Sequence, residues 1–204
     1  MVQIIGLTGG IATGKSLVSS HLDRLGYVLT DADEITHNLL EEPTIIEQII
    51  ALFGPAVATP ITDQEQIIDR QILSELIFTS PQAKKQLESL LHPLIIAEIK
   101  KQLSAYQKGG AQQPIFIVAP LLIETDLQQL TDQVWLVEVS AENQLKRLMK
   151  RNNISKEQAQ QRIGAQLSPA ARRPHATHLI DNNGSPTQTT AQVDRLLRQF
   201  TSSN

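Results

Sequence analysis

Gly9-Gly10-Ile11-Ala12-Thr13-Gly14-Lys15-Ser16 is the stretch of this chain that decides its fold. It fits the pattern G-x-x-x-x-G-K-[ST] of a phosphate-binding P-loop, in which glycines let the backbone turn tightly and point N–H groups at an anion. The helix that follows such a loop adds its positive N-terminal end. Lys15 supplies a cation for the β- and γ-phosphates of ATP, and the Ser16 hydroxyl is a ligand for Mg²⁺.

The context of the loop is the one that the motif requires. Residues 2–7 before it are rich in β-branched side chains, as in a buried strand, and residues 17–22 after it carry apolar side chains at helical spacing. Further strands are predicted at residues 27–30, 114–119, 134–139 and 178–180, with helical patterns between them. This alternation predicts an α/β fold with a parallel five-stranded sheet flanked by helices.

The interval between the second and third predicted strands is too long for a simple crossover. We predict an insert at residues 35–111 that is helical throughout, with Asp63 capping a helix that runs to Ile77 and Ser80-Pro81 opening the next helix. Residues 1–34 and 112–204 then form the nucleotide-binding core. Inserts in α/β enzymes commonly build the substrate side of a cleft, so we expect this one to bind the acceptor substrate.

Composition excludes several classes of protein. The chain has 204 residues, a net charge of −3 and no cysteine, which excludes disulfides, thiolate zinc sites and cysteine nucleophiles. Neither a signal peptide nor an apolar run long enough to cross a membrane is present in the sequence. Only 3% of the residues are aromatic, which argues against base stacking and hence against nucleic-acid binding. We therefore expect a cytoplasmic protein, monomeric or weakly homo-oligomeric, with a small-molecule partner.

Two groups of charged residues are candidates for chemistry. Asp31 and Asp33 follow the second predicted strand, at the edge of a parallel sheet where ligands bind. We predict that Asp33 is the base that takes a proton from an acceptor hydroxyl, the alternative being a helix cap, which we favour for Asp31. Basic residues concentrate between Ser140 and Pro174, and Arg147 and Arg151 share one helix face there. Arginine suits a phosphate clamp because its planar fork matches phosphate oxygens.

The assembled motifs resemble those of the dephospho-coenzyme A kinase family over essentially the whole chain. The resemblance begins with L-T-G-G-I-x-x-G-K-S at residues 7–16 and D-A-D at 31–33, and continues with D-R-x-x-L at 69–73 and L-H-P at 91–93. It extends through P-L-L-x-E at 120–124, Q-L-x-R at 144–147, R-I-x-x-Q at 162–166 and I-D-N-x-G at 180–184. One departure is Ala12, where the family often has glycine.

This resemblance implies a P-loop kinase fold with a lid over roughly residues 143–175. It implies transfer of the γ-phosphoryl group of ATP to the ribose 3′-hydroxyl of dephospho-coenzyme A, the final step of coenzyme A biosynthesis, with ATP and Mg²⁺ as cofactors. The catalytic residues would be Asp33, Lys15 and Arg147, the last as the lid arginine. ATP would be bound by Gly10, Ile11, Ala12, Thr13, Gly14, Lys15, Ser16 and Leu17, with Ser16 as the metal ligand. The acceptor would be bound by Asp33, Arg70, His92, Pro120, Leu121 and Leu122.

Three other functions fit a P-loop. Another small-molecule or nucleotide kinase would share the loop and a basic lid but differ in the insert. A GTPase switch needs an N-K-x-D guanine reader, which the sequence lacks. A mechanical ATPase needs an acidic residue at the end of an apolar strand, but the predicted strand at residues 114–119 ends in Ala119-Pro120.

Overall fold

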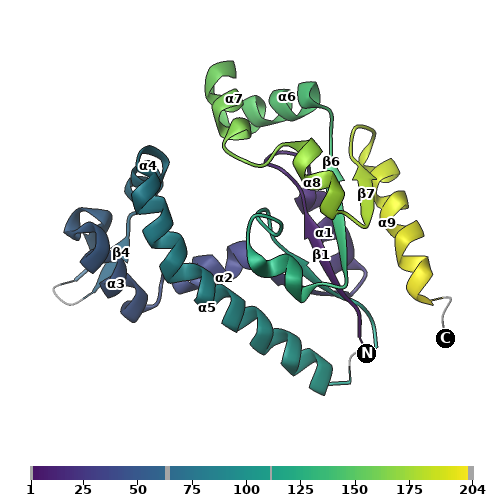
Figure 1. Ribbon diagram of the computed structural model, residues 1–204, viewed down its shortest axis with the longest axis horizontal. Helices are drawn as coiled ribbons and strands as arrows, with labels where there is room; N and C mark the ends of the chain where they lie inside the picture. Colours follow the sequence, from purple (N-terminus) through teal and green to yellow (C-terminus); the bar gives the residue numbers. More distant parts are fainter. Residues whose placement is uncertain (1, 63–64, 111, 202–204) are drawn as a thin grey trace. The chain divides into compact units, whose positions relative to one another are not determined.

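The computed structural model describes residues 2–62, 65–110 and 112–201 (Figure 1). It divides by its internal contacts into two units, which we call the core unit, Met1–Asp31 with Gln102–Asn204, and the inserted unit, Ala32–Lys101. The predicted boundaries at residues 34 and 112 lie near this division, which passes through one continuous helix on the C-terminal side. In the described part of the chain, no helix combines the length and the apolar character needed to span a membrane.

The core unit contains a five-stranded parallel sheet in the order β2-β5-β1-β6-β7. All five predicted strands are present, so the predicted fold class is confirmed. In the register of the sheet, Leu7 of the central strand β1 is paired with Val118 of β5 on one side and with Trp135 of β6 on the other. The strands are β1 (Ile4–Thr8), β2 (Val28–Asp31), β5 (Ile115–Val118), β6 (Gln133–Glu138) and β7 (His178–Asp181).

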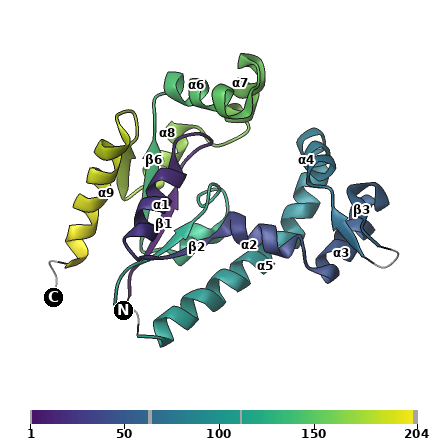
Figure 2. The ribbon, with the colours of Figure 1, turned by 180° about the vertical axis from the view of Figure 1, so that it is seen from behind.

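Two helices cover one face of this sheet. These helices, α1 (Lys15–Arg24) and α9 (Pro186–Thr201), can be followed beside the sheet in Figure 2. Their side chains join alternate residues of the strands in one buried cluster. Within it, Phe116 packs edge-on against Trp135, with ring centroids 5.3 Å apart. The intervening residues face the other way, where Gly6 contacts Leu122 in the segment before η2 (Asp126–Leu130). Burial on both faces explains why the strands are continuous apolar runs.

The inserted unit is mostly helical but contains an antiparallel hairpin. Its strands β3 (Ala58–Pro60) and β4 (Gln66–Ile68) pair with Ala58 opposite Ile68, whose side chain is buried. The prediction that the insert is helical throughout is therefore wrong here, because Pro55 and Pro60 interrupt the helical run and β-branched Ile67 and Ile68 favour a strand. The other elements are α2 (Ala32–Leu39), α3 (Pro43–Phe53), η1 (Pro55–Val57), α4 (Arg70–Thr79) and most of α5 (Pro81–Lys108).

Two helix starts in this unit test the predicted caps. Asp63 lies outside the described residues, and α4 begins instead after Asp69, whose Oδ1 accepts hydrogen bonds of 3.0 Å from the backbone N–H groups of Gln71 and Ile72. Ser80 caps α5 as predicted, since its hydroxyl accepts from the backbone N–H of Ala83 at 3.2 Å.

The region predicted as a lid consists of short capped helices in the core unit. Serine side chains accept backbone hydrogen bonds at the start of each α-helix, and α7 has a complete capping box between Ser155 and Gln158. Asn153, at φ 51°, ends the first of them. The helices are α6 (Ala141–Asn152), α7 (Lys156–Gly164), α8 (Pro169–Arg172) and η3 (Arg173–His175). Each of the three α-helices is thus defined locally, by its own serine cap.

Candidate active site

The P-loop connects the carboxyl end of β1 to the first residue of α1. Ala12 and Gly14 adopt left-handed conformations, with φ of 60° and 95°, which fold the loop into a concave turn. The Thr13 hydroxyl donates a 2.9 Å hydrogen bond to the Gly10 carbonyl, and the Thr13 N–H donates to the same oxygen at 3.2 Å. Helix α1 then begins with Lys15, so its N-terminal N–H groups face the loop. This backbone has the form of an anion-binding cradle.

Two glycines of the loop are required by close neighbours as well as by conformation. A β-carbon added at Gly10 would lie 2.6 Å from Nη1 of Arg172. One added at Gly14 would overlap the side-chain amide of Asn182, and φ at Gly14 is also unfavourable for other residues. Side chains from two distant parts of the sequence therefore pack directly on the loop backbone.

Three buried or half-buried amide side chains hold the loop in place. Ile11 is held on both sides: its N–H donates to Oε1 of Gln166 at 2.8 Å, and its carbonyl accepts from Nε2 of Gln144 at 2.8 Å. Asn182 donates through Nδ2 to the carbonyl of Thr13 at 2.7 Å. The sequence motifs contain all three residues, but sequence reasoning gave them no role. Their place in these motifs is the signal that could have pointed to them.

Asn182 is itself positioned by a second buried polar side chain. Its Oδ1 accepts a 2.8 Å hydrogen bond from the hydroxyl of Thr189, which is fully buried on α9. The loop is thus connected through Asn182 to the helix that covers the sheet. A loop fixed in this way can bind phosphate with little ordering on binding.

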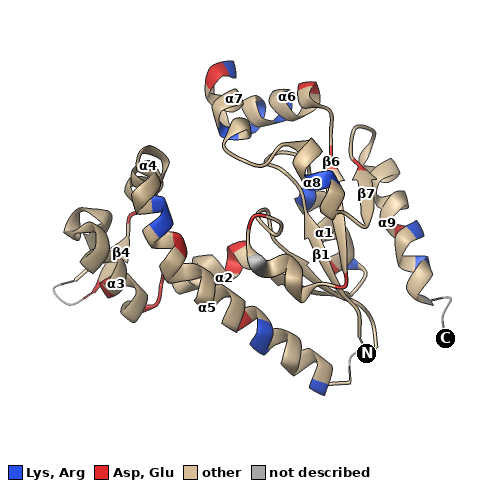
Figure 3. Cartoon of the chain, in the orientation of Figure 1, with Lys and Arg blue, Asp and Glu red and all other residues tan. Residues whose placement is uncertain are grey.

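The structure brings Arg147 to the P-loop. Its Nη2 donates to the backbone carbonyl of Asn182 at 2.8 Å, and its Nη1 would lie 3.7 Å from a β-carbon at Gly14. The neighbouring Lys146 is exposed and pairs with Glu142 at 2.6 Å, an interaction that lowers the pKa of the Glu142 carboxyl. Figure 3 shows basic residues along α6, α7 and α8. Of the basic residues at 146 and 147, only Arg147 has the contact expected of a phosphate-binding side chain.

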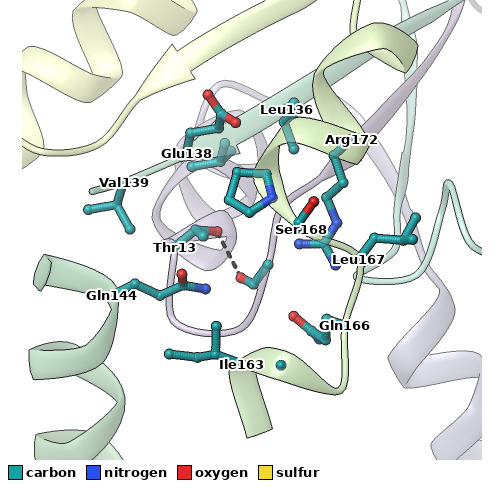
Figure 4. Close-up of a pocket in the computed structure, with 14 residues that line it drawn as sticks. Thr13, Leu136, Glu138, Val139, Gln144, Ile163, Gln166, Leu167, Ser168 and Arg172 are labelled. Carbon is teal, nitrogen blue, oxygen red and sulfur yellow. Dashed lines mark hydrogen bonds between the residues drawn. The ribbon is translucent and has the colours of Figure 1, made fainter. Parts of the chain in front are cut away.

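A cavity of about 230 Å³ lies beside the strand end of the loop (Figure 4). Gly10, Thr13 and Gln144 line it together with Arg172, whose side chain is 5% exposed. Nη2 of Arg172 donates to Oε1 of Glu124 at 2.7 Å, which gives Glu124 of the P-L-L-x-E motif a partner on α8. Sequence reasoning placed Arg172 only in a general basic surface; its burial is a tertiary property that composition does not reveal.

The remaining predicted residues of the P-loop lie at the start of α1. Lys15 and Leu17 are half-buried and Ser16 is exposed. The Ser16 hydroxyl is therefore accessible to a ligand. Among the described residues there is no group of three or more His, Asp or Glu side chains that could hold a metal ion.

The segment after β5 lies beside the P-loop, as the carboxyl end of a neighbouring strand must. The Thr8 hydroxyl, at the end of β1, donates to the carbonyl of Pro120 at 3.3 Å. Leu121 is 36% exposed, but Leu122 is fully buried against Gly6. Leu122 thus packs in the core, contrary to its predicted place on a cleft wall, and the accessible residues of this segment are Pro120 and Leu121.

The other predicted acceptor residues lie in the inserted unit. Asp33 is exposed in the first turn of α2, two residues after the end of β2. Arg70 contacts the imidazole of His37 and pairs with Glu41 at 3.1 Å. His92 is half-buried on α5. The roles of Asp33, Arg70 and His92 toward an acceptor stay predictions.

Comparison with known proteins identifies the family. Residues 3–188 match the family model described as dephospho-CoA kinase. A dephospho-CoA kinase of Symbiobacterium thermophilum is 40% identical over 198 residues, which are 97% of this chain and 81% of the relative. The crystal structure of TT1252 from Thermus thermophilus has a TM-score of 0.81 at 29% identity, and a dephospho-CoA kinase structure from Campylobacter jejuni has 0.65 at 28%, each with 97% of both chains covered. The chain belongs to the dephospho-CoA kinase family.

Proposed function

We propose that this protein transfers the γ-phosphoryl group of ATP to the ribose 3′-hydroxyl of dephospho-coenzyme A, the last step in the formation of coenzyme A. The observation that carries this proposal is a P-loop fixed by Gln144, Gln166 and Asn182 in a chain of the dephospho-CoA kinase family. Such a loop is built to hold a triphosphate without moving, and family membership supplies the acceptor.

The loop amides and Lys15 hold the phosphates in this proposal. The backbone N–H groups around the left-handed Ala12 and Gly14 receive the β-phosphate oxygens, and the α1 N-terminus adds positive potential. Lys15 balances the charge that develops between the β- and γ-phosphates during transfer. Removing such a preorganised charge usually costs about 3 kcal/mol or more of transition-state stabilisation.

The residues present fit a Mg²⁺ ion that arrives with the nucleotide. Ser16 offers an exposed hydroxyl at the start of α1, and Mg²⁺ in such sites takes its other ligands from substrate phosphates and water. When bound, the ion would neutralise negative charge on the phosphates during transfer. Ser16 would be the residue of this chain that holds it.

Asp33 is the proposed acceptor of the proton from the 3′-hydroxyl. Val118 of β5 is the register partner of Asp31, at the end of β2, on one side. On the other side it is the register partner of Leu7 of β1. The carboxyl ends of β2 and β1 therefore share one sheet edge, and Asp33 follows that edge by two residues. This placement supports a base near the phosphate cradle.

Arg147 is proposed to assist at the nucleotide phosphates. Its anchor on the Asn182 carbonyl uses one nitrogen of the guanidinium group, so other N–H groups of the fork remain for phosphate oxygens. The proximity of Nη1 to Gly14 supports this role. Because Gly14 begins the turn into α1, Arg147 would act at the α1 end of the cradle.

On the acceptor side, we propose that Pro120 and Leu121 meet the substrate together with Arg70 and His92 from the inserted unit. Arg70 would exchange its contact with Glu41 for a phosphate oxygen of the acceptor. We further propose that the protein acts in the cytoplasm on free small molecules, without nucleic acid, as a monomer or weak homo-oligomer.

The test is the identity of the product. We expect incubation with ATP, Mg²⁺ and dephospho-coenzyme A to yield ADP and an acceptor heavier by one phosphoryl group, with no product from an analogue that lacks the 3′-hydroxyl. Lys15→Ala, as a folded control, should lower kcat by about a hundredfold or more. Equal phosphorylation of the 3′-deoxy analogue would contradict the proposed site of transfer.

A further inference from the structure

Arg172 is the most deeply buried charged side chain at the edge of the P-loop. Its residue is 4% exposed, and it lies so close to Gly10 that a β-carbon there would come within 2.6 Å of Nη1. A buried guanidinium is costly unless acceptors surround it. Its position therefore calls for a functional explanation beyond packing.

The hydrogen bonds of Arg172 are incomplete within the part of the chain that the structure describes. A guanidinium has five N–H donors. Nη2 donates to Glu124, but Nε is buried and has no hydrogen-bond partner among the described residues. A buried donor without an acceptor costs about as much as a lost hydrogen bond, and an anionic ligand would satisfy it.

The cavity that Arg172 lines is the right size for part of a ligand. Its volume of about 230 Å³ is below the roughly 300–1,000 Å³ of sites that hold whole drug-sized ligands. Gly10 and Thr13 of the P-loop line it as well, and Figure 4 shows Arg172 among the side chains that surround it. The space has room for a phosphoryl group that extends from the loop toward Arg172, beside apolar side chains such as Leu136 and Ile163 and the carboxylate residue Glu138.

The contacts at the two ends of the P-loop indicate which phosphate group of ATP Arg172 would bind. Arg147 lies at the α1 end, beside Gly14, whereas Arg172 lies at the strand end, beside Gly10. Arg172 is joined through Glu124 to the segment after β5. The proposed function places the acceptor at Pro120 and Leu121 of that segment, so the strand end of the loop faces the acceptor. The phosphate nearest the acceptor is the one that is transferred.

We propose that Arg172 binds the γ-phosphoryl group during transfer and that Glu124 is its positioning residue. This inference rests on the proposed function. In the transfer, the acceptor 3′-oxygen forms a bond to the γ-phosphorus, the bond from that phosphorus to the β–γ bridging oxygen breaks with its electron pair leaving on ADP, and the hydroxyl proton passes to Asp33. Arg172 stabilises the non-bridging oxygens of the moving group.

Binding of nucleotides that differ only in the γ-phosphate tests the inference. We would measure Kd by calorimetry for ADP and for an ATP analogue with a nitrogen bridge between the β- and γ-phosphates. Arg172→Met should weaken analogue binding by about tenfold or more, as loss of a charge-assisted hydrogen bond predicts, and change ADP binding by less than about threefold. Arg173→Met is the matched control, because Arg173 is exposed and pairs with Glu138. Arg173→Met should leave the Kd for ADP and the Kd for the ATP analogue unchanged.

Three further variants test the role of Glu124 and guard against misfolding of Arg172→Met. Arg172→Lys keeps the charge but not the fork, and should also lose preference for the analogue over ADP. Glu124→Gln keeps an acceptor for Nη2 and should retain that preference within about threefold, whereas Glu124→Ala should reduce it. If both Arg172 variants keep the wild-type preference, or weaken both ligands equally, the inference is overturned. Transfer to dephospho-coenzyme A by the wild type, measured alongside, would leave the proposed function standing in that case.

Discussion

Replacing Asn182 with alanine should destabilise the protein through the P-loop. The substitution removes the 2.7 Å bond from Nδ2 to the Thr13 carbonyl and the 2.8 Å bond from the Thr189 hydroxyl to Oδ1. Asn182, Thr13 and Thr189 are 4%, 6% and 0% exposed, so water does not readily replace either bond. The Thr13 carbonyl loses the partner that Asn182 provides, whereas the Thr189 hydroxyl keeps a weaker acceptor, the Ser185 carbonyl at 3.4 Å. One buried polar group left without a partner costs about 1–3 kcal/mol, which is the decrease in the free energy of unfolding that we expect.

The assay is thermal and denaturant unfolding. For a chain of this size each kcal/mol lowers Tm by about 2–4 °C, so the expected decrease is at least about 2 °C. Because the backbone carbonyl that binds Arg147 is retained in Asn182→Ala, the weakened ATP binding that we also expect would come from the Thr13 end of the loop.

Two further variants distinguish the loss of the Asn182 hydrogen bonds from unspecific destabilisation of the fold. Thr189→Val keeps the shape of the side chain and removes only its hydroxyl, so a double-mutant cycle with Asn182→Ala should give a coupling free energy of about 0.5 kcal/mol or more. Asn183→Ala removes hydrogen bonds that are exposed and should cost less. An Asn182→Ala protein with unchanged Tm and unchanged ATP affinity would refute the reasoning.

Four further substitutions test the site. Asp33→Asn should keep ATP affinity and lose most transfer in a coupled ADP assay, because the amide cannot take the proton; wild-type kcat would return Asp33 to a structural role. Arg147→Lys should lower kcat by roughly ten- to a thousandfold, whereas Lys146→Ala, which breaks an exposed pair with Glu142, should change it less than about threefold; equal losses would indicate a diffuse basic surface. Ala12→Gly should raise the free energy of unfolding by about 0.5–1 kcal/mol, since it relieves the left-handed φ of 60° but adds unfolded-state entropy; a less stable variant in denaturant would contradict this.

The elements that sequence predicts well are those with local signals. The five sheet strands are apolar runs bounded by turns, and the P-loop is a contiguous motif, so neither depends on distant partners. Ser80 could be identified as a cap for the same reason. The hairpin of the inserted unit was missed because each strand has only three residues, too few for a period to be read.

The contacts that complete the site are not local. Gln166 meets Ile11 across 155 residues of sequence, and Asn182 meets Thr13 across 169. Composition shows that these polar residues exist, but only the fold shows that they are buried together. The burial of Leu122 follows from the absence of a side chain at Gly6, on a different strand, which no pattern near residue 122 records.

The dependence of ATP turnover on the acceptor tests the central claim most directly. The P-loop here follows β1 in a sheet whose neighbouring strand β5 ends in Val118, Ala119 and Pro120, without the acidic residue that positions water in hydrolytic ATPases. We therefore predict that ADP formation with Mg²⁺ is slow with ATP alone and rises by orders of magnitude when dephospho-coenzyme A is added, with one phosphorylated acceptor per ADP. ADP formation at the full rate without any acceptor would contradict the account.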